Sequence, residues 1–258
     1  MTTWALGLQY IGSLYHGWQM QSAVPSIQLY VEKALSKVAA TPIRVICAGR
    51  TDQGVHAWQQ VIHFKTHVIR PMHAWVRGVN TYLPADISVQ WAKIVDDDFH
   101  ARFGALSRQY HYVINNVQQR SAVTHQRMTW WRPALDVGKM QEAAQYLLGN
   151  HDFSSFRGPH CQAKTPRRTI SHIDIKRHQD TIIMCIEANA FLHHMVRNIM
   201  GMLLCVGEGQ QAPAWAETVL MARQRVISTL MAPADGLYLT NVYYPAHYEI
   251  PMAPDFLY

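Results

Sequence analysis

The order of apolar segments along the chain is the feature that most constrains its fold. Strand-like alternation of apolar and polar residues occurs at 3–10, 43–48, 61–65, 87–95, 108–114, 170–176, 181–188 and 237–244. Helical spacing of apolar residues occurs at 26–39, 72–83, 136–148, 190–206 and 215–223. Strands and helices therefore alternate in both halves of the chain, which predicts an α+β protein made of two similar halves.

The chain has 258 residues, enough for one large domain or two modest ones, each with its own core. The apolar pattern breaks at Asp96, Asp97 and Asp98, so we expect a domain boundary near there. We predict an N-terminal half at 1–104, a C-terminal half at 105–248 and a C-terminal tail at 249–258.

The composition excludes a disordered chain, because 49% of the residues are hydrophobic and only 16% are charged. Lys and Arg number 23 against 17 Asp and Glu, a net charge of +6 that makes a polyanion a plausible partner. The four cysteines have no CxxC spacing, which argues against a disulfide framework or a zinc knuckle and fits a reducing compartment. The longest apolar stretch, Met195–Val206, is interrupted by Arg197 and Asn198, and the first ten residues do not resemble a signal peptide. We expect a cytoplasmic protein.

A polar, glycine-flanked turn at Gly49–Ala57 carries the densest chemical information. It lies between two predicted strands and contains Arg50 and Asp52, which project to the same side of an extended backbone. A guanidinium and a carboxylate could then face one cleft. The alternative is an ordinary turn aspartate with a neighbouring arginine.

The predicted helix at 190–206 is apolar on almost every side, so we expect it to be buried. Arg197 lies on this helix one turn after His193, and a buried cation needs an anionic partner such as an ionised aspartate. The alternative is an arginine that reaches solvent or pairs with a carboxylate for packing alone.

A basic tract spans 157–177, where Lys164, Arg167 and Arg168 are the foremost cations and Asp174 is the one acid. Such a tract could hold phosphates, or it could simply be a solvated face.

Other common site types have no support. His193 and His194 are adjacent on the predicted helix and do not converge on a metal, and His160–Cys161 has no second ligand pair nearby. Gly207–Ala212 looks like a dinucleotide fingerprint but follows a helix, so we interpret it as a helix stop. No P-loop, HExxH or GxSxG motif occurs.

The turn at Gly49–Ala57, followed by His63–Phe64, resembles the active-site motif GRTDxGVHA of the tRNA pseudouridine synthase A family. Further motifs follow in the family's order: Gly17–Gln21, Asn80, Leu83–Ile87, Phe99–Arg102, Arg108–Tyr112, His151–Arg157, Ala190–Ile199 and Ala232–Leu237.

The resemblance implies isomerisation of uridine to pseudouridine at positions 38, 39 and 40 of the tRNA anticodon stem-loop, by a homodimer without cofactor or metal. It implies two ferredoxin-like halves with a continuous, mainly antiparallel sheet and a central active-site cleft. By the same resemblance Asp52 is the catalytic aspartate and Tyr110 stacks on the base and assists proton removal from C5. Arg197 pairs with the aspartate, Arg50 helps to turn the nucleotide out, and Leu237 contacts the base.

These residue types suit the reaction. Breaking the bond between C1′ and N1 builds positive charge on the sugar, which an ionised Asp52 can stabilise or attack. A closed pocket would raise the pKa of this carboxyl and Arg197 would oppose that. Tyr110 and Leu237 would keep the detached uracil in place and exclude water. We therefore hypothesise that the basic tract binds the phosphate backbone of the tRNA.

Three positions depart from the family's pattern. Ile11 stands where Asp is usual, Gln224 where an Asp-Arg pair is usual, and Met231 where Thr is usual. None of them is Asp52, Tyr110 or Arg197, so they bear on the predicted substrate range and not on the predicted reaction. The alternative functions are an RNA-binding or tRNA-folding chaperone of the same fold, with secondary or lost catalysis, and a synthase that acts on another RNA.

Overall fold

The computed structural model describes residues 1–159, 161–224 and 230–256. The chain divides into two compact units, each described by itself. Unit 1 contains Met1–Leu106 and the segment that begins at Tyr238, and unit 2 contains Ser107–Leu237. None of the described helices is both long and apolar enough to span a membrane.

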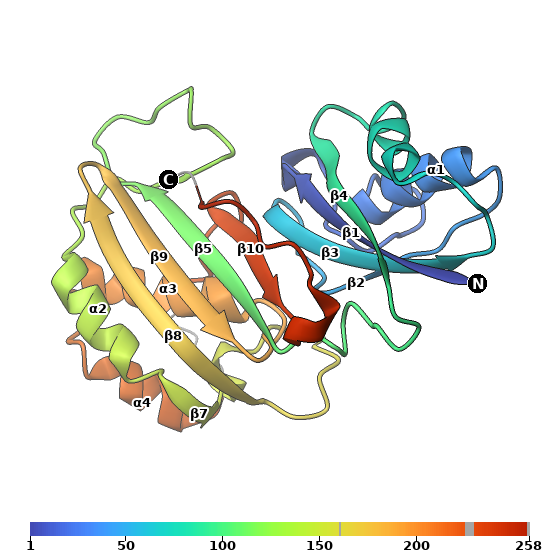
Figure 1. Ribbon diagram of the computed structural model, residues 1–258. Helices are drawn as coiled ribbons and strands as arrows, with labels where there is room; N and C mark the ends of the chain where they lie inside the picture. Colours follow the sequence, from blue (N-terminus) through green and yellow to red (C-terminus); the bar gives the residue numbers. More distant parts are fainter. Residues whose placement is uncertain (160, 225–229, 257–258) are drawn as a thin grey trace. The chain divides into compact units, whose positions relative to one another are not determined.

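Unit 1 is a sheet with helices on one face (Figure 1). Its elements are β1 (Thr2–Tyr10), α1 (Ile27–Ala39), β2 (Ile46–Cys47), β3 (His56–Thr66), η2 (Ala74–Gly78) and β4 (Ile87–Val95). Antiparallel pairing gives the order β4-β1-β3-β2. A βαββαβ chain with this strand order is ferredoxin-like. Near its start β3 also pairs in parallel with β10 (Leu237–Tyr243), where Tyr238 lies opposite His56.

The sequence explains α1 and β1 directly. α1 buries Ile27, Val31, Ala34 and Leu35, which lie at helical spacing and face the sheet. Ser26 at its N-terminus is extended and Ala40 after its C-terminus is left-handed, so the helix expected at 26–39 is confirmed to within one residue.

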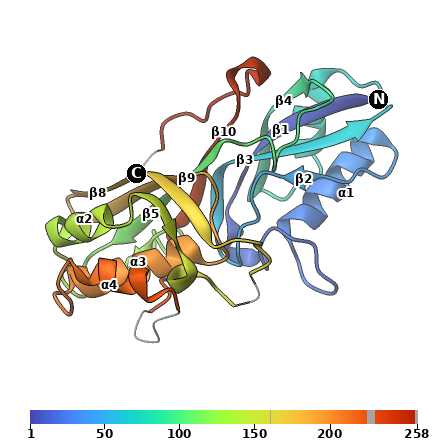
Figure 2. The ribbon, with the colours of Figure 1, turned by 90° about the horizontal axis from the view of Figure 1, so that it is seen from below.

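Unit 2 also places its helices on one face of a sheet (Figures 1 and 2). Its elements are β5 (Ser107–Asn115), β6 (Thr129–Trp130), α2 (Val137–Gln145), β7 (Gly149–Asp152), β8 (Arg167–His178), β9 (Thr181–Ala188), α3 (Met195–Gly207) and α4 (Trp215–Ala222). The antiparallel order is β5-β9-β8-β7, and β6 pairs with the end of β5 in parallel.

The helix expected to be buried on almost every side is confirmed as α3. Every residue from Met195 to Gly207 is buried except Arg197 and Cys205, which are partly buried. The segment after α3 is the expected helix stop, because Gly209 has φ of +74° and its amide returns to the Val206 carbonyl.

Some expected boundaries are wrong. The helix expected from Ala190 begins at Met195, because His194 has φ of +62° and interrupts the helical backbone. His193 therefore lies in the preceding turn and not on the helix. The strand expected at 43–48 shrinks to β2, and the helix expected to reach 148 ends at Gln145.

Two short strands, β6 and β7, had no detectable sequence pattern. Strands of two and four residues are too short to show alternation, so tertiary pairing with β5 and β8 decides them.

Gly201 on α3 lets the Leu230 carbonyl approach the helix. A Cβ at this position would lie 1.5 Å from that oxygen, so Gly201→Ala forces the two backbones apart. We expect Gly201→Ala to lower the free energy of unfolding by about 3 kcal/mol, measured by urea denaturation. Gly78→Ala is the control, because its nearest neighbour would lie 3.5 Å away. A similar loss in both variants would contradict this explanation.

Candidate active site

The turn that carries Asp52 joins β2 to β3, and its backbone is fixed immediately before that residue. Thr51 is buried, its hydroxyl lies 2.8 Å from the Tyr10 hydroxyl, and its carbonyl accepts from the Trp18 amide at 3.0 Å. The Val55 amide closes the turn on the Asp52 carbonyl at 3.1 Å. Asp52 itself is half-buried and Arg50 is exposed.

Two glycines in the loop after β1 allow this close packing. Gly17 has φ of +81°, and a Cβ on it would lie 2.7 Å from the Thr51 carbonyl. A Cβ on Gly12 would lie 2.0 Å from the Val55 carbonyl, and the Gly12 amide donates to Nδ1 of His56. The loop and the turn therefore touch backbone to backbone, which only glycine permits at these positions.

Gln60 on β3 fixes the other end of the turn. Its Nε2 donates to the Gly49 carbonyl at 2.6 Å, and its Oε1 accepts from the Gly49 amide at 3.3 Å. Gln60 is fully buried, so these bonds are costly to lose.

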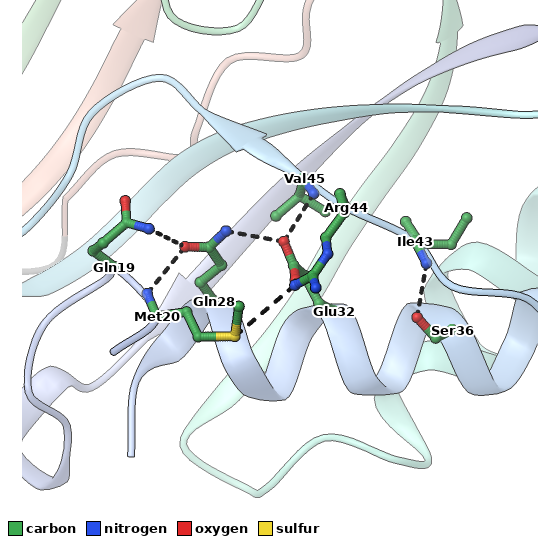
Figure 3. A network of polar contacts seen from close by, with 8 residues as sticks. All are labelled: Gln19, Met20, Gln28, Glu32, Ser36, Ile43, Arg44 and Val45. Carbon is green, nitrogen blue, oxygen red and sulfur yellow. Dashed lines mark hydrogen bonds and ion pairs between the residues drawn. The ribbon is translucent and has the colours of Figure 1, made fainter. Parts of the chain in front are cut away.

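A second polar network begins at Glu32 on α1 (Figure 3). This carboxylate is buried and accepts from Nη1 of Arg44 at 2.6 Å, from the Val45 amide at 3.1 Å and from the Gln28 amide group at 2.9 Å. Gln28 in turn accepts from the Met20 amide at 3.0 Å. Glu32 thus connects the loop after β1 to the segment that leads through β2 to the Asp52 turn.

His63 on β3 supports the Phe99–Arg102 motif. Its Nδ1 accepts from the Ala101 amide at 3.1 Å, and its ring lies beside those of Phe99 and His100. Burial, followed by the charges of His100 and Lys65, lowers the pKa of His63 to about 4, so the ring is neutral at pH 7. The acceptor role of Nδ1 requires that neutral form.

In unit 2, Tyr110 lies on β5 with its side chain buried. Its ring packs edge-to-face on Phe191 at 5.1 Å, within the Ala190–Ile199 motif. Tyr110 and the Ala190–Ile199 motif, which are far apart in the sequence, are therefore in contact in the structure.

Arg197 holds the Ala232–Leu237 segment against α3. Its Nε donates to the Ala232 carbonyl at 2.8 Å, and its own carbonyl accepts from the Ala232 amide at 3.1 Å. Leu237 ends this segment, is 5% exposed, and donates its amide to Ala234. The structure thus brings Arg197 and the Leu237 segment together; the pairing of Arg197 with Asp52 stays a prediction.

Tyr112 also holds the Ala232–Leu237 segment in place, a role that the sequence analysis did not assign to it. Its hydroxyl lies 2.7 Å from that of Thr129 and donates to the Pro233 carbonyl at 2.8 Å, and Thr129 donates to Asp235 at 3.0 Å. Burial raises the pKa of Tyr112 well above its usual range, so it stays a donor. The signal was present in Arg108–Tyr112, where Tyr112 follows Tyr110 on the same face of the strand.

The backbone at Gly158 packs against the turn before α3. A Cβ on Gly158 would lie 2.8 Å from Nδ1 of His194, and the Gly158 amide donates to the His193 carbonyl. Burial raises the pKa of the Cys161 thiol, but hydrogen bonds from the His193 and Ala163 amides and from Arg157 outweigh it and leave the pKa lowered. His160 lies outside the described residues.

The cations of the basic tract fall into two groups: some donate to main-chain carbonyls, and others are exposed to solvent. The guanidinium groups of Arg157, Arg168 and Arg177 donate to main-chain carbonyls of unit 2. Burial lowers the pKa of Arg168, which is half-buried. Lys164 and Arg167 are exposed, so they are the predicted phosphate contacts whose side chains face solvent.

The comparison with known proteins agrees with these motifs. The profile described as tRNA pseudouridine synthase matches residues 8–104 and 143–245. A protein named tRNA pseudouridine synthase A from Pseudomonas aeruginosa is 52% identical over 257 residues, covering 98% of this chain and 90% of the relative. Proteins of the same name are 50% identical in Vibrio cholerae, over 98% of this chain and 97% of the relative, and 52% identical in Klebsiella pneumoniae, over 97% and 93%. The chain belongs to the tRNA pseudouridine synthase family.

Glu32→Gln should destabilise unit 1, because an amide cannot accept all three hydrogen bonds of the buried carboxylate. We expect a loss of about 2 kcal/mol in the free energy of unfolding, measured by urea denaturation. Arg44→Gln is the matched control: the Arg44 side chain is 74% exposed, so removing it should cost less than about 1 kcal/mol. Equal losses would show that the carboxylate matters only through Arg44.

Arg197→Lys should loosen the Ala232–Leu237 segment, because an ammonium cannot reproduce the Nε–H bond to the Ala232 carbonyl in the same geometry. We expect the Leu237 amide to exchange hydrogen at least about tenfold faster, while amides of α2 are unchanged, measured by hydrogen exchange. Unchanged protection at Leu237 would contradict the role of the Arg197 side chain in holding this segment.

Proposed function

We propose that this protein isomerises uridine to pseudouridine at positions 38, 39 and 40 in the anticodon stem-loop of tRNA. Membership of the family makes the chain an isomerase that acts on uridine in tRNA. The observation that carries the proposal is the Gly49–Ala57 turn, with its backbone fixed on both sides of a half-buried Asp52.

The reaction needs no outside reagent, since the product is an isomer of the substrate. The bond between C1′ and N1 breaks, and Asp52 stabilises the positive sugar or bonds to C1′. The uracil rotates, C5 bonds to C1′, the proton leaves C5, and N1 ends protonated. The carboxylate is released unchanged.

The other residues have roles that suit their positions. Tyr110, whose ring packs on Phe191, would stack on the base and assist removal of the C5 proton. Leu237 would supply an apolar wall, and Arg197 would both hold that wall and pair with Asp52 in the working enzyme. Arg50, which is exposed, would fill the space of the nucleotide turned out of the stack.

Phosphate contacts would come first from Lys164 and Arg167, whose side chains are exposed. Arg168 would contribute less, because its Nη1 already donates to the Thr165 carbonyl at 2.9 Å. The resemblance further supports a homodimer working in the cytoplasm, with no cofactor or metal.

The competing proposal is an RNA-binding or tRNA-folding chaperone with secondary or lost catalysis. It predicts binding of tRNA with no new nucleoside. The presence of Asp52, Tyr110 and Arg197 in their motifs favours the enzyme.

Mapping the product in tRNA tests the proposal. Purified protein is incubated with transcripts that carry uridine singly at 38, 39 or 40, and pseudouridine is located by carbodiimide modification and primer extension. We expect a stop at each of the three positions and none in transcripts with cytidine there. Bound but unmodified tRNA would favour the chaperone, and pseudouridine elsewhere would overturn the assigned positions.

A further inference from the structure

The segment that joins β5 to β6 and continues to α2 carries a cationic surface with no assigned role. We call residues 116–132 the arginine loop, after its exposed Arg120, Arg127 and Arg132. No acidic residue occurs between Asn116 and Leu135. The family profile covers residues 8–104 and 143–245, so the match assigns nothing to this segment.

The arginine loop is ordered by its own hydrogen bonds. The Asn116 side chain donates to the carbonyls of Trp131 and Pro133 at 2.8 and 2.7 Å, and Nε1 of Trp130 donates to the Val117 carbonyl at 2.9 Å. The Thr124 carbonyl accepts from the Arg127 and Met128 amides. Binding would therefore cost little conformational entropy in the backbone that presents the arginines.

Two large apolar side chains of the same loop are exposed. Trp130 is 43% exposed and Val123 is 88% exposed. An exposed indole on the same loop as exposed guanidinium groups is the combination that contacts ribose and bases next to phosphates. An acidic protein surface would match the charge but would not need the indole.

The neighbouring charges do not cancel this surface. Three carboxylates lie next to the loop. The Asn116 amide donates to the main-chain carbonyl of Asp180 in the β8–β9 turn, Nε1 of Trp131 donates to Glu208 at 2.8 Å, and the Thr129 hydroxyl donates to Asp235 at 3.0 Å. Arg177 donates to the Asn116 side chain and adds a further cation there. The four arginines, the three of the loop and Arg177, outnumber these three carboxylates.

The loop lies far from the base-binding tyrosine within unit 2. The loop begins at Asn116, one residue after β5 ends and six residues after Tyr110, which corresponds to about 20 Å of extended strand. Figure 1 shows the light-green loop extending past the end of β5, where β8 ends and β9 begins. A contact there reaches RNA beyond the nucleotides that adjoin a uridine held at Tyr110.

We propose that the arginine loop is a second RNA-binding surface, which contacts backbone phosphates of tRNA outside the anticodon stem-loop. Arg120, Arg127 and Arg132 bind the phosphates, and Trp130 packs on a ribose or base beside them. This inference rests on tRNA being the substrate, and it adds a contact that selects full-length tRNA over a fragment.

The test compares two RNAs and two triple variants. The loop variant is R120Q/R127Q/R132Q. The control is K33Q/K37Q/R77Q, which removes three exposed cations from α1 and η2 of unit 1. Binding to full-length tRNA and to an isolated anticodon stem-loop is measured over a range of salt concentrations, and pseudouridine formation in the stem-loop reports the active site.

We expect the loop variant to bind full-length tRNA about tenfold more weakly than the unaltered protein, with the salt slope of log K smaller by about two to three. Its binding to the stem-loop, and pseudouridine formation there, should match those of the unaltered protein. The control should keep its preference for full-length tRNA.

Several results would overturn the inference. One is equal weakening by both variants, which would show a general effect of charge; another is equal weakening for both RNAs. Unchanged binding with an altered sedimentation coefficient would assign the loop to contact between protein copies. Absence of pseudouridine formation by the unaltered protein would instead contradict the proposed function.

Discussion

The close approach of two backbones in unit 1 is the constraint on which the candidate site depends. The loop after β1 lies directly on the Asp52 turn, and the Gly12 and Gly17 positions have no room for a Cβ. Such contact leaves main-chain polar groups buried, so each needs a partner. Thr51, Trp18 and Gln60 supply those partners, and the turn therefore presents Asp52 on a backbone fixed before substrate arrives.

In unit 2, side chains supply the hydrogen-bond partners that a buried irregular segment needs. The Ala232–Leu237 segment has no regular structure before β10, yet it is buried at Ala232 and at Leu237. Arg197 and Tyr112 satisfy its carbonyls at Ala232 and Pro233. Arg197, which the sequence analysis proposed as a site residue, thus also stabilises this segment. The two tasks are compatible, because Nε holds the segment while the remaining guanidinium N–H groups can serve a carboxylate.

The sequence predicted the long helices and strands well, but it did not reveal the buried polar side chains that hold the loops in place. α1, β4 and β9 follow from apolar spacing alone: α1 buries apolar residues at helical spacing, and the side chains of the two strands alternate between more and less buried positions. Glu32 and Gln60 could not be identified in this way, because their importance comes from partners distant in the sequence. For Tyr112 the position on the strand could be predicted, but its partners Thr129 and Pro233 could not. The start of α3 was missed for a related reason: nothing in the residue types before Met195 indicates that His194 is left-handed.

The candidate site was found through motif resemblance and only in part through residue chemistry. Arg50 and Asp52 looked like an ordinary turn, and three arginines of the basic tract turned out to bind their own main chain. A charge run does not reveal which guanidinium groups face inward, because that depends on the carbonyls that the fold places near them. Conversely, the arginine loop showed no motif, and its ordered exposed cations became visible only in the structure.

The central claim is that the carboxylate of Asp52 performs the chemistry on a turn whose conformation does not depend on it. Asp52→Asn tests this directly, since the amide keeps the shape and removes the charge. Release of tritium from C5-labelled uridine in tRNA should fall by at least about a thousandfold, while tRNA affinity and thermal stability stay as in the unaltered protein. Release within tenfold of the unaltered rate would contradict the account and assign the reaction to another group.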